Sequence, residues 1–376
     1  MNKGNFVNTR GKFLEEALTQ QLAKLLYSIP WLKEISFEQQ PKGIRGGFDL
    51  RVRFHASRKV KCELLVEIKS EPRPSRFPYA NIDRESAPER GSLTRVFVLG
   101  TPHISPRMAE VCEKYGWSWF DLAGNCRISI PEILHLERRG NPPVYFAPKP
   151  KANLGTHEAG RVIRTLLVPS NAARVWTQRS LQKECYPKVS LGLVNKVVTY
   201  LQEEGFVAPL KGGGFRLHDP MQLLFAWKDL YRFDLHQQRH YFTLKKGDKL
   251  RIALANLAAK TDHICHAAFS AADFQAPYVR QPKTWIYITQ QGLQYLQPVV
   301  EAKPVESGEN LVVLVPADDG VFYQLEGNDN IYHLPYTNPV QTYIDLWHCG
   351  GRGQEAAEAI LEQCLKPRWK MAGLPV

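Results

Sequence analysis

A glutamate and a lysine stand out in a largely apolar stretch, and an aspartate stands out in the stretch before it. The run CELLVEIKS, residues 62–70, places Glu67 and Lys69 two positions apart. Alternate residues of a β-strand point to opposite faces, so both side chains are expected on one face. Asp49, in the preceding strand-like run GGFDLRVRF, could bring a second carboxylate to the same place. A carboxylate buried beside an apolar sheet loses its hydration and needs a positive charge or a hydrogen-bond donor beside it. We therefore expect these three side chains to meet.

This set of groups suits phosphodiester hydrolysis. Paired carboxylates are hard oxygen ligands for Mg²⁺ or Mn²⁺, and the bound cation polarises a phosphate and lowers the pKa of a bound water. The lysine would orient that water or stabilise developing charge. The alternative is a solvated Glu67–Lys69 ion pair on an edge strand, because this spacing also arises by chance.

Asp49 followed by Glu67-Ile68-Lys69 resembles the signature of the PD-(D/E)XK, or restriction-endonuclease-like, nucleases. That superfamily often adds a glutamate on an upstream helix, and GKFLE, ending at Glu15, fits this form. The resemblance implies a restriction-endonuclease-like fold for residues 1–150. It also implies metal ligation by Asp49 and Glu67, and the following catalytic residues: Glu15, Asp49, Glu67 and Lys69. Phe48 stands where the signature has proline.

The surrounding elements fit an α/β domain. Leucines at three-to-four-residue spacing over residues 11–27 predict an amphipathic helix. Two strand-like runs follow, and then come a strand at TRVFVLG, a helix at PRMAEVCEKYG and a strand at WSWFDLAG. This order predicts helices layered on a sheet. The segment RRGNPPVYFAPKPKANLG lacks periodicity and is rich in proline and glycine, so we expect a linker or crossing loop there.

Composition limits the possible classes of protein. A length of 376 residues allows two or three domains, and 44% hydrophobic and 23% charged residues are typical of a globular chain. No apolar run approaches the roughly 20 residues of a membrane helix, and MNKGNFVNTRGKF has no apolar signal segment. The seven scattered cysteines argue against a disulfide framework. We therefore expect a cytoplasmic protein without membrane association.

The net charge of +12 is unevenly distributed along the chain. Residues 1–150 contain 24 Lys and Arg against 16 Asp and Glu, and residues 151–220 contain 10 against 5. Residues 221–376 contain 15 against 16. The basic excess therefore lies in the first 220 residues, which favours a polyanionic partner for that part of the chain.

Residues 155–220 predict three helices and a β-hairpin. The helical runs are GRVIRTLLV, TQRSLQKECY and SLGLVNKVVTYLQEEG, with Thr177 and Ser190 as expected N-caps. We expect the third helix to bury Leu191, Val194, Val198 and Leu201. The hairpin FVAPLKGGGFRLHD turns at three glycines. This order indicates a winged helix-turn-helix, which places its third helix in the major groove of double-stranded DNA.

The expected DNA contacts lie on the third helix, just before it, and on the hairpin: Lys188, Ser190, Asn195, Lys196, Thr199, Lys211 and Arg216. A winged helix used for protein contact is the alternative. Residues 221–376 begin with MQLLFAWKDLYRFDLHQQRHYF, expected to be one long helix. They continue through LRIALANLAAK, TWIYIT and LVVLVPA as a C-terminal α/β domain. We expect a regulatory or interaction role for this domain.

Three segments carry a second resemblance: WFDLAGNCRI, RLHDPMQLLFAWKDLYRF and NPVQTYIDLWHCGGRGQEAAEAIL. Together they resemble bacterial transcriptional regulators of the AbiEi antitoxin-like group, from about residue 95 onward. The resemblance implies a DNA-binding regulator of a type IV toxin-antitoxin system. It also implies that the C-terminal domain binds a partner toxin or forms a homodimer. Asp121 in the first segment has a simpler interpretation, as the cap of a turn with Asn125.

Two hypotheses of different classes follow. The first is a DNA-binding regulator that keeps a nuclease-like domain for gripping DNA. The second is a Mg²⁺-dependent DNA endonuclease, in phage defence, targeted by its winged helix. Fold alone does not decide between them. We favour the regulator, because its resemblance covers more residues than the three-residue site.

Overall fold

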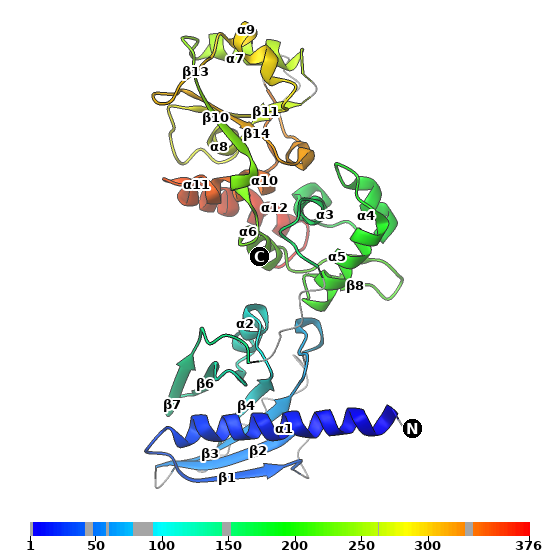
Figure 1. The fold of residues 1–376 in the computed structure, drawn as a ribbon, viewed down its shortest axis with the longest axis vertical. Coiled ribbons are helices and arrows are strands. Elements are labelled where there is room, and N and C mark those ends of the chain that lie inside the picture. The colour runs from blue at the N-terminus through cyan, green and yellow to red at the C-terminus, as the bar shows by residue number, and fades with distance from the viewer. Residues whose placement is uncertain are drawn as a thin grey trace. The chain divides into compact units, whose positions relative to one another are not determined.

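The computed structural model divides the chain into two compact units, Met1–Lys149 and Pro150–Val376 (Figure 1). The boundary lies in the segment expected to be a linker. None of the described helices is both long and apolar enough to cross a membrane. The structure describes residues 3–41, 48–57, 60–77, 93–144, 152–261, 263–327 and 334–376.

The first unit is built on one seven-stranded sheet whose strands follow sequence order. The strands are β1 (Lys33–Gln39), β2 (Leu50–Ser57), β3 (Val60–Ile68), β4 (Leu93–Thr101), β5 (Ser118–Asp121), β6 (Cys126–Ile130) and β7 (Leu134–Arg138). The pairs β3–β4 and β4–β5 are parallel, and the other pairs are antiparallel. The crossover from β4 to β5 contains α2 (Pro106–Lys114), and the short helix η1 (Pro74–Arg76) follows β3.

The sheet separates two cores. On one face, leucines of α1 (Lys3–Tyr27) pack against the even-numbered residues of β3, such as Leu64 and Val66. On the other face, Met108 and Cys112 of α2 pack near Leu65. The expected amphipathic helix and α/β layering of residues 1–150 are therefore confirmed. Glu67, an odd-numbered residue of β3, belongs by alternation to the face that α2 covers.

The second unit begins with the three helices and the hairpin expected from the sequence. These are α3 (His157–Leu167), α4 (Gln178–Glu184), α5 (Leu191–Glu203), β8 (Val207–Pro209) and β9 (Phe215–Leu217). Thr177 caps α4 by accepting from the backbone of Ser180, and Ser190 caps α5 by accepting from Leu193. Both expected caps are confirmed. A bridge between Trp176 and Phe215 ties the segment before α4 to the hairpin.

The expected long helix after residue 220 is wrong. The helix α6 (Pro220–Lys228) is short, the turn η3 (Phe233–Leu235) follows it, and Gln237–Phe242 forms strand β10. Strand β10 pairs with the buried strand β14 (Leu311–Val315). A buried strand needs ladder partners on both edges for its backbone groups, and this tertiary demand outweighs the helical pattern of residues 237–242.

Strand β10 belongs to a five-stranded sheet with the order β11-β12-β14-β10-β13. Only the pair β12–β14 is parallel. The remaining strands and helices are β11 (Ile264–His266), β12 (Thr284–Ile288), β13 (Lys303–Pro304), α7 (Asp248–Ala258), α8 (Ala268–Gln275), α9 (Leu293–Val300), η4 (Asp319–Phe322), α10 (Pro339–His348), α11 (Gly353–Ile360), η5 (Leu361–Leu365) and α12 (Lys366–Met371). The sequence prediction of an α/β arrangement after residue 220 is therefore confirmed.

One hydrophobic core runs through the second unit without a break at residue 220. It joins Leu166 of α3 and Val198 of α5 to Tyr343 and Ile360 of the C-terminal helices. The indole Nε1 of Trp369 donates to the carbonyl oxygen of Leu167 over 2.9 Å. The three helices and the C-terminal part are therefore packed as one unit.

Candidate nucleic-acid interface and acidic site

The structure places Asp49, Glu67 and Lys69 at the same end of the β2–β3 pair. Leu50 pairs with Val66, so Asp49 lies across from Glu67 in this register. The carboxylate of Asp49 accepts a hydrogen bond from the backbone nitrogen of Ile68 over 2.7 Å. The ammonium of Lys69 lies 2.8 Å from a carboxylate oxygen of Glu67. These contacts gather the three side chains that the sequence singled out.

Three observations limit what this acidic site can do. The side chain of Lys69 is 53% exposed and that of Glu67 is 18% exposed, so the pair is partly solvated and contributes about 1 kcal/mol or less to stability. Glu15 lies on α1, whose leucines cover the opposite face of the sheet. In the described part of the chain, no three His, Cys, Asp or Glu side chains are grouped to hold a metal. A cation here would have two protein carboxylates, with water or phosphate as its other ligands.

Asp121 has a structural role in the turn between β5 and β6. It is fully buried, and its carboxylate accepts hydrogen bonds from the backbone and side-chain nitrogens of Asn125, each over 3.0 Å. The Asn125 side chain also bonds to Asn141. The simpler interpretation of DLAGN, as a capped turn, is confirmed.

Sequence reasoning missed an arginine cluster on β2, β3 and β4. Glu63 is 1% exposed and accepts hydrogen bonds from Arg53 over 3.0 Å and from Arg95 over 2.7 Å. Arg51 approaches to 3.5 Å. Burial acts to raise the pKa of Glu63, but the hydrogen bonds and charges of Arg95 and Arg53 outweigh it and lower the pKa overall. Arg51 also pairs with Glu38 over 2.8 Å, so three arginines and two glutamates leave one net positive charge on this part of the sheet. The alternation Arg-Val-Arg at 51–53 was the available signal.

The exposed face of α5 carries the residues expected to contact DNA. Asn195 and Lys196 are exposed and Thr199 is half-buried, one turn further along. The side-chain nitrogen of Asn195 donates to the Gln178 side chain of α4 over 3.1 Å, which fixes its orientation. Lys188 and Ser190 precede the helix and are exposed, but the Ser190 hydroxyl is occupied as the cap.

The hairpin supplies two further cations, because Lys211 near its tip and Arg216 on β9 are both exposed. Helix α4 adds Arg179 and Lys183, which are exposed and four residues apart. These two residues were not among the predicted DNA contacts, although their i, i+4 spacing in TQRSLQKE was visible. All four cations belong to the elements that surround α5.

The prediction that Leu191 is buried is wrong. Its side chain is 38% exposed, whereas Val197, which was not predicted, is buried. Leu191 is the first residue of α5, and one turn later on the same side lies Asn195. The start of the helix therefore presents an apolar group beside the polar ones, because the core beneath α5 begins only at Val194.

Comparison with known proteins finds a similarity for the C-terminal part. The model of a family described as "Transcriptional regulator, AbiEi antitoxin, Type IV TA system" matches residues 216–366. No curated protein and no solved structure matches the chain. The matched region begins in β9 and ends at the first residue of α12. Residues 216–366 are thus similar to the antitoxin regulators of type IV toxin-antitoxin systems.

Proposed function

We propose that this chain is a DNA-binding transcriptional regulator of the AbiEi antitoxin type, and that α3–α5 with β8 and β9 form its winged helix-turn-helix. The observation that carries the proposal is the family match over residues 216–366. The match begins in β9, the second strand of the hairpin that follows α5, and α3 and α5 share one hydrophobic core with the matched region. The regulator acts on double-stranded DNA in the cytoplasm.

The exposed face of α5 is suited to the major groove. An asparagine pairs with adenine through two hydrogen bonds, and a lysine reaches the acceptors of guanine. Asn195 and Lys196 supply these groups, and Leu191 supplies apolar contact for a thymine methyl. Lys188, Lys211 and Arg216 would neutralise phosphates at the sides, which adds affinity without sequence information.

A gel-shift titration with DNA from upstream of the gene tests this proposal. The double variant Asn195→Ala/Lys196→Ala should weaken specific binding by about 1–3 kcal/mol for each base that is no longer recognised. The matched control is Asn256→Ala/Lys249→Ala, which removes the same exposed residue types from α7. Equal affinities of the two double variants would show that α5 is not the recognition helix.

The second candidate function is a Mg²⁺- or Mn²⁺-dependent DNA endonuclease of the PD-(D/E)XK type. The gathering of Asp49, Glu67 and Lys69 at one end of β3 favours it. Plasmid DNA incubated with the protein and either metal tests it directly. Cleavage that is abolished in Lys69→Ala and kept in Lys61→Ala, an exposed lysine of the same strand, would establish the endonuclease.

If no cleavage occurs, the first unit has a gripping role, and its arginine cluster is the surface for the DNA backbone. We further propose that residues 216–366 bind the partner toxin or a second copy of the chain. Light scattering of the purified chain measures its self-association, and co-purification with the product of the neighbouring gene tests for a toxin partner. A chain that is monomeric and captures no neighbour would contradict this part of the proposal.

A further inference from the structure

A cavity lies at the carboxyl ends of the parallel strands β12 and β14. Thr289 directly follows β12, Asp319 lies shortly after β14, and His263 precedes β11 at the same end, because β11 runs antiparallel to β12. The volume of the cavity is about 350 Å³, within the roughly 300–1,000 Å³ of small-molecule sites. In open α/β sheets, ligands commonly bind outside the carboxyl ends of parallel strands. The position and the size therefore fit a small organic molecule.

The side chains that line this cavity are polar. Among the described residues, its lining contains no Leu, Ile, Val, Met, Phe or Trp. The hydroxyls of Thr261 and Thr289 lie 3.4 Å apart, and Gln291, Gln294 and Tyr295 come from the turn before α9 and its first residues. The side chains of these last three make no hydrogen bond within the described part of the chain. A ligand that fits here must offer hydrogen-bonding groups, because polar groups that are covered without a partner cost free energy.

One part of the cavity wall depends on a glycine. Gly292 is buried just before α9, and a Cβ at its position would lie 2.7 Å from Oγ1 of Thr261 and 2.6 Å from Cγ1 of Ile288. Any other residue would push the start of α9 away from Thr261. The two segments that form this wall are therefore closely packed against each other.

Two opposite charges line the cavity from different elements. Lys260 follows the end of α7 and Asp319 begins η4, and both side chains are exposed. Neither forms an ion pair with a residue that the structure describes. A simple anion would leave Asp319 unpaired, a simple cation would leave Lys260 unpaired, and a neutral sugar would pair with neither charge. A molecule with one carboxylate and one ammonium group pairs with both through charge-assisted hydrogen bonds.

His263 connects the cavity to the segment before α5. It lines the cavity, and its Nε2 lies 2.6 Å from the hydroxyl oxygen of Tyr186. The two rings are also stacked, with centroids 5.8 Å apart and an interplanar angle of 8°. Tyr186 belongs to the short segment between α4 and α5. A ligand in contact with His263 is therefore one side chain away from the segment that leads into α5.

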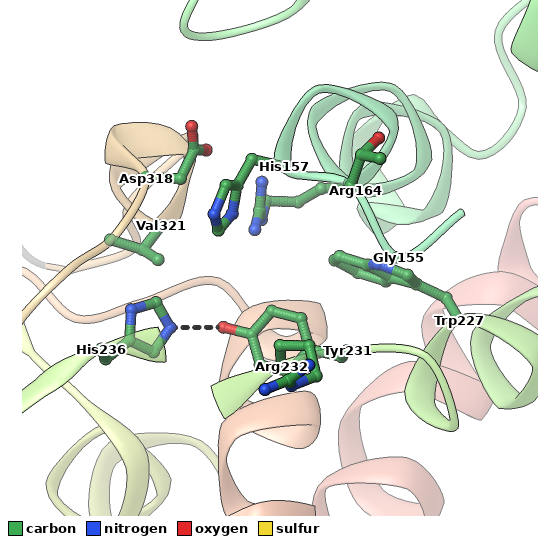
Figure 2. A pocket seen from close by; sticks show the side chains of 11 residues that line it. Gly155, His157, Arg164, Trp227, Tyr231, Arg232, His236, Asp318 and Val321 are labelled. Carbon is green, nitrogen blue, oxygen red and sulfur yellow. Dashed lines mark hydrogen bonds between the residues drawn. The ribbon is translucent and has the colours of Figure 1, made fainter. Parts of the chain in front are cut away.

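A second connection runs through Arg161 of α3. Its Nε donates to the carboxylate of Asp318 over 2.9 Å, and its Nη1 donates to the carbonyl oxygen of Lys188 over 3.3 Å. Asp318 directly precedes Asp319, and Figure 2 shows it on the turn into η4, beside the start of α3. The segment between α4 and α5 is thus attached to the surroundings of the cavity at Tyr186 and at Lys188.

We propose that this cavity binds a free amino acid with a polar side chain. Lys260 pairs with its carboxylate, Asp319 pairs with its ammonium group, and the amides and hydroxyls of the wall bind its side chain. Occupation of the cavity fixes His263 and η4, and through Tyr186 and Arg161 it fixes the entry to α5. The amino acid therefore acts as an effector of DNA binding, a consequence that rests on the proposed function of α5 as the recognition helix.

Isothermal titration calorimetry of the full chain with L-serine, L-asparagine and L-glutamine tests the site. At least one of the three should bind saturably, at one site per chain. L-Leucine should bind about tenfold more weakly than the best of them, because the wall offers it no apolar surface. The N-acetylated form of that amino acid lacks the ammonium group and its amide lacks the carboxylate, so each should also bind about tenfold more weakly.

Two variants locate the binding. Lys260→Ala and Asp319→Ala should each weaken it about tenfold, and both positions are exposed, so the chain should still fold. The matched controls Lys249→Ala on α7 and Asp229→Ala after α6 remove the same exposed residue types outside the cavity and should bind like wild type. No binding of any of the three amino acids, or equal binding by the cavity variants and their controls, would overturn the site. Equal binding of the N-acetylated form or of the amide would overturn the assignment to an amino acid.

Hydrogen–deuterium exchange, measured by mass spectrometry, tests the connection to α5 without DNA. The bound amino acid should slow exchange of the backbone amides of residues 186–193 about threefold or more in wild type. Tyr186→Phe should still bind the amino acid but lose most of this protection. Unchanged exchange in wild type, or equal protection in Tyr186→Phe, would overturn the connection through Tyr186.

A gel-shift titration with and without the amino acid separates the effector role from the proposed function. The bound amino acid should raise the affinity for DNA about fivefold or more. An affinity that is the same with and without it would overturn the effector role. A chain that binds no DNA under either condition would contradict the regulator, whereas the calorimetric and exchange results would still decide the site and its connection to α5.

Discussion

Replacing Asp345 with asparagine should remove a large pH dependence from the stability of the second unit. Asp345 is fully buried on α10 and accepts hydrogen bonds from the hydroxyls of Tyr231 and Tyr287, each over 3.0 Å. Burial is the largest cause of its raised pKa, about 7 in the folded chain against 3.8 for the free side chain. In the folded chain, the carboxyl group of Asp345 therefore binds a proton more tightly than it does in the unfolded chain.

The sign and size of the effect follow from linkage. With the folded pKa above the unfolded one, the stability that protonated Asp345 contributes is complete below about pH 4 and is lost as pH rises through 7. Between pH 5 and pH 8 the loss amounts to about 2–3 kcal/mol. An asparagine does not titrate, and its amide can still bond to Tyr287 and Gln341. The free energy of unfolding of Asp345→Asn, measured relative to that of wild type, should therefore be about 2–3 kcal/mol higher at pH 8 than at pH 5.

Urea unfolding followed by tryptophan fluorescence at the two pH values measures this difference. Contributions of all other groups cancel when variant and wild type are compared at the same pH. Asp229→Asn, at an exposed position just after α6, is the control and should show no such gain. A difference between Asp345→Asn and wild type that is the same at pH 5 and pH 8 would refute the argument that Asp345 is ionised while buried.

Three further outcomes are expected. Glu63→Ala should destabilise the first unit by about 3 kcal/mol, because it removes the shared partner of three arginines, and thermal unfolding checks this. Lys211→Ala and Arg216→Ala should each lower the slope of log affinity against log salt by about 1 in a DNA titration, whereas an unchanged slope would place the hairpin off the DNA. A fragment of residues 150–376 should fold alone. A fragment of residues 1–220 should leave α3–α5 poorly folded, because it lacks the C-terminal half of the hydrophobic core that these helices share. Proton nuclear magnetic resonance spectra of the two fragments distinguish a folded from a poorly folded chain.

Local sequence patterns were enough for the elements whose stability is local. The leucine spacing of α1 and the caps at Thr177 and Ser190 were predicted correctly, because helix periodicity and cap hydrogen bonds involve residues within one or two turns. The positions of Asp49, Glu67 and Lys69 on neighbouring strands were also accessible, because strand alternation fixes which side chains share a face.

Long-range packing decided the rest. The chain changes from helix α6 to strand β10 because the buried strand β14 needs a hydrogen-bonding partner on its second edge. The residues around 237–242 carry no local pattern that shows this requirement. Likewise, Glu63 gains its arginines from strands on both sides, and Arg164 meets Gln341 across 177 residues of sequence. The sequence by itself determined the helices α1, α3, α4 and α5, the caps at Thr177 and Ser190, and the basic front of the chain. Only the tertiary structure decided which charges are buried and paired, because desolvation and pairing depend on neighbours that the fold brings together.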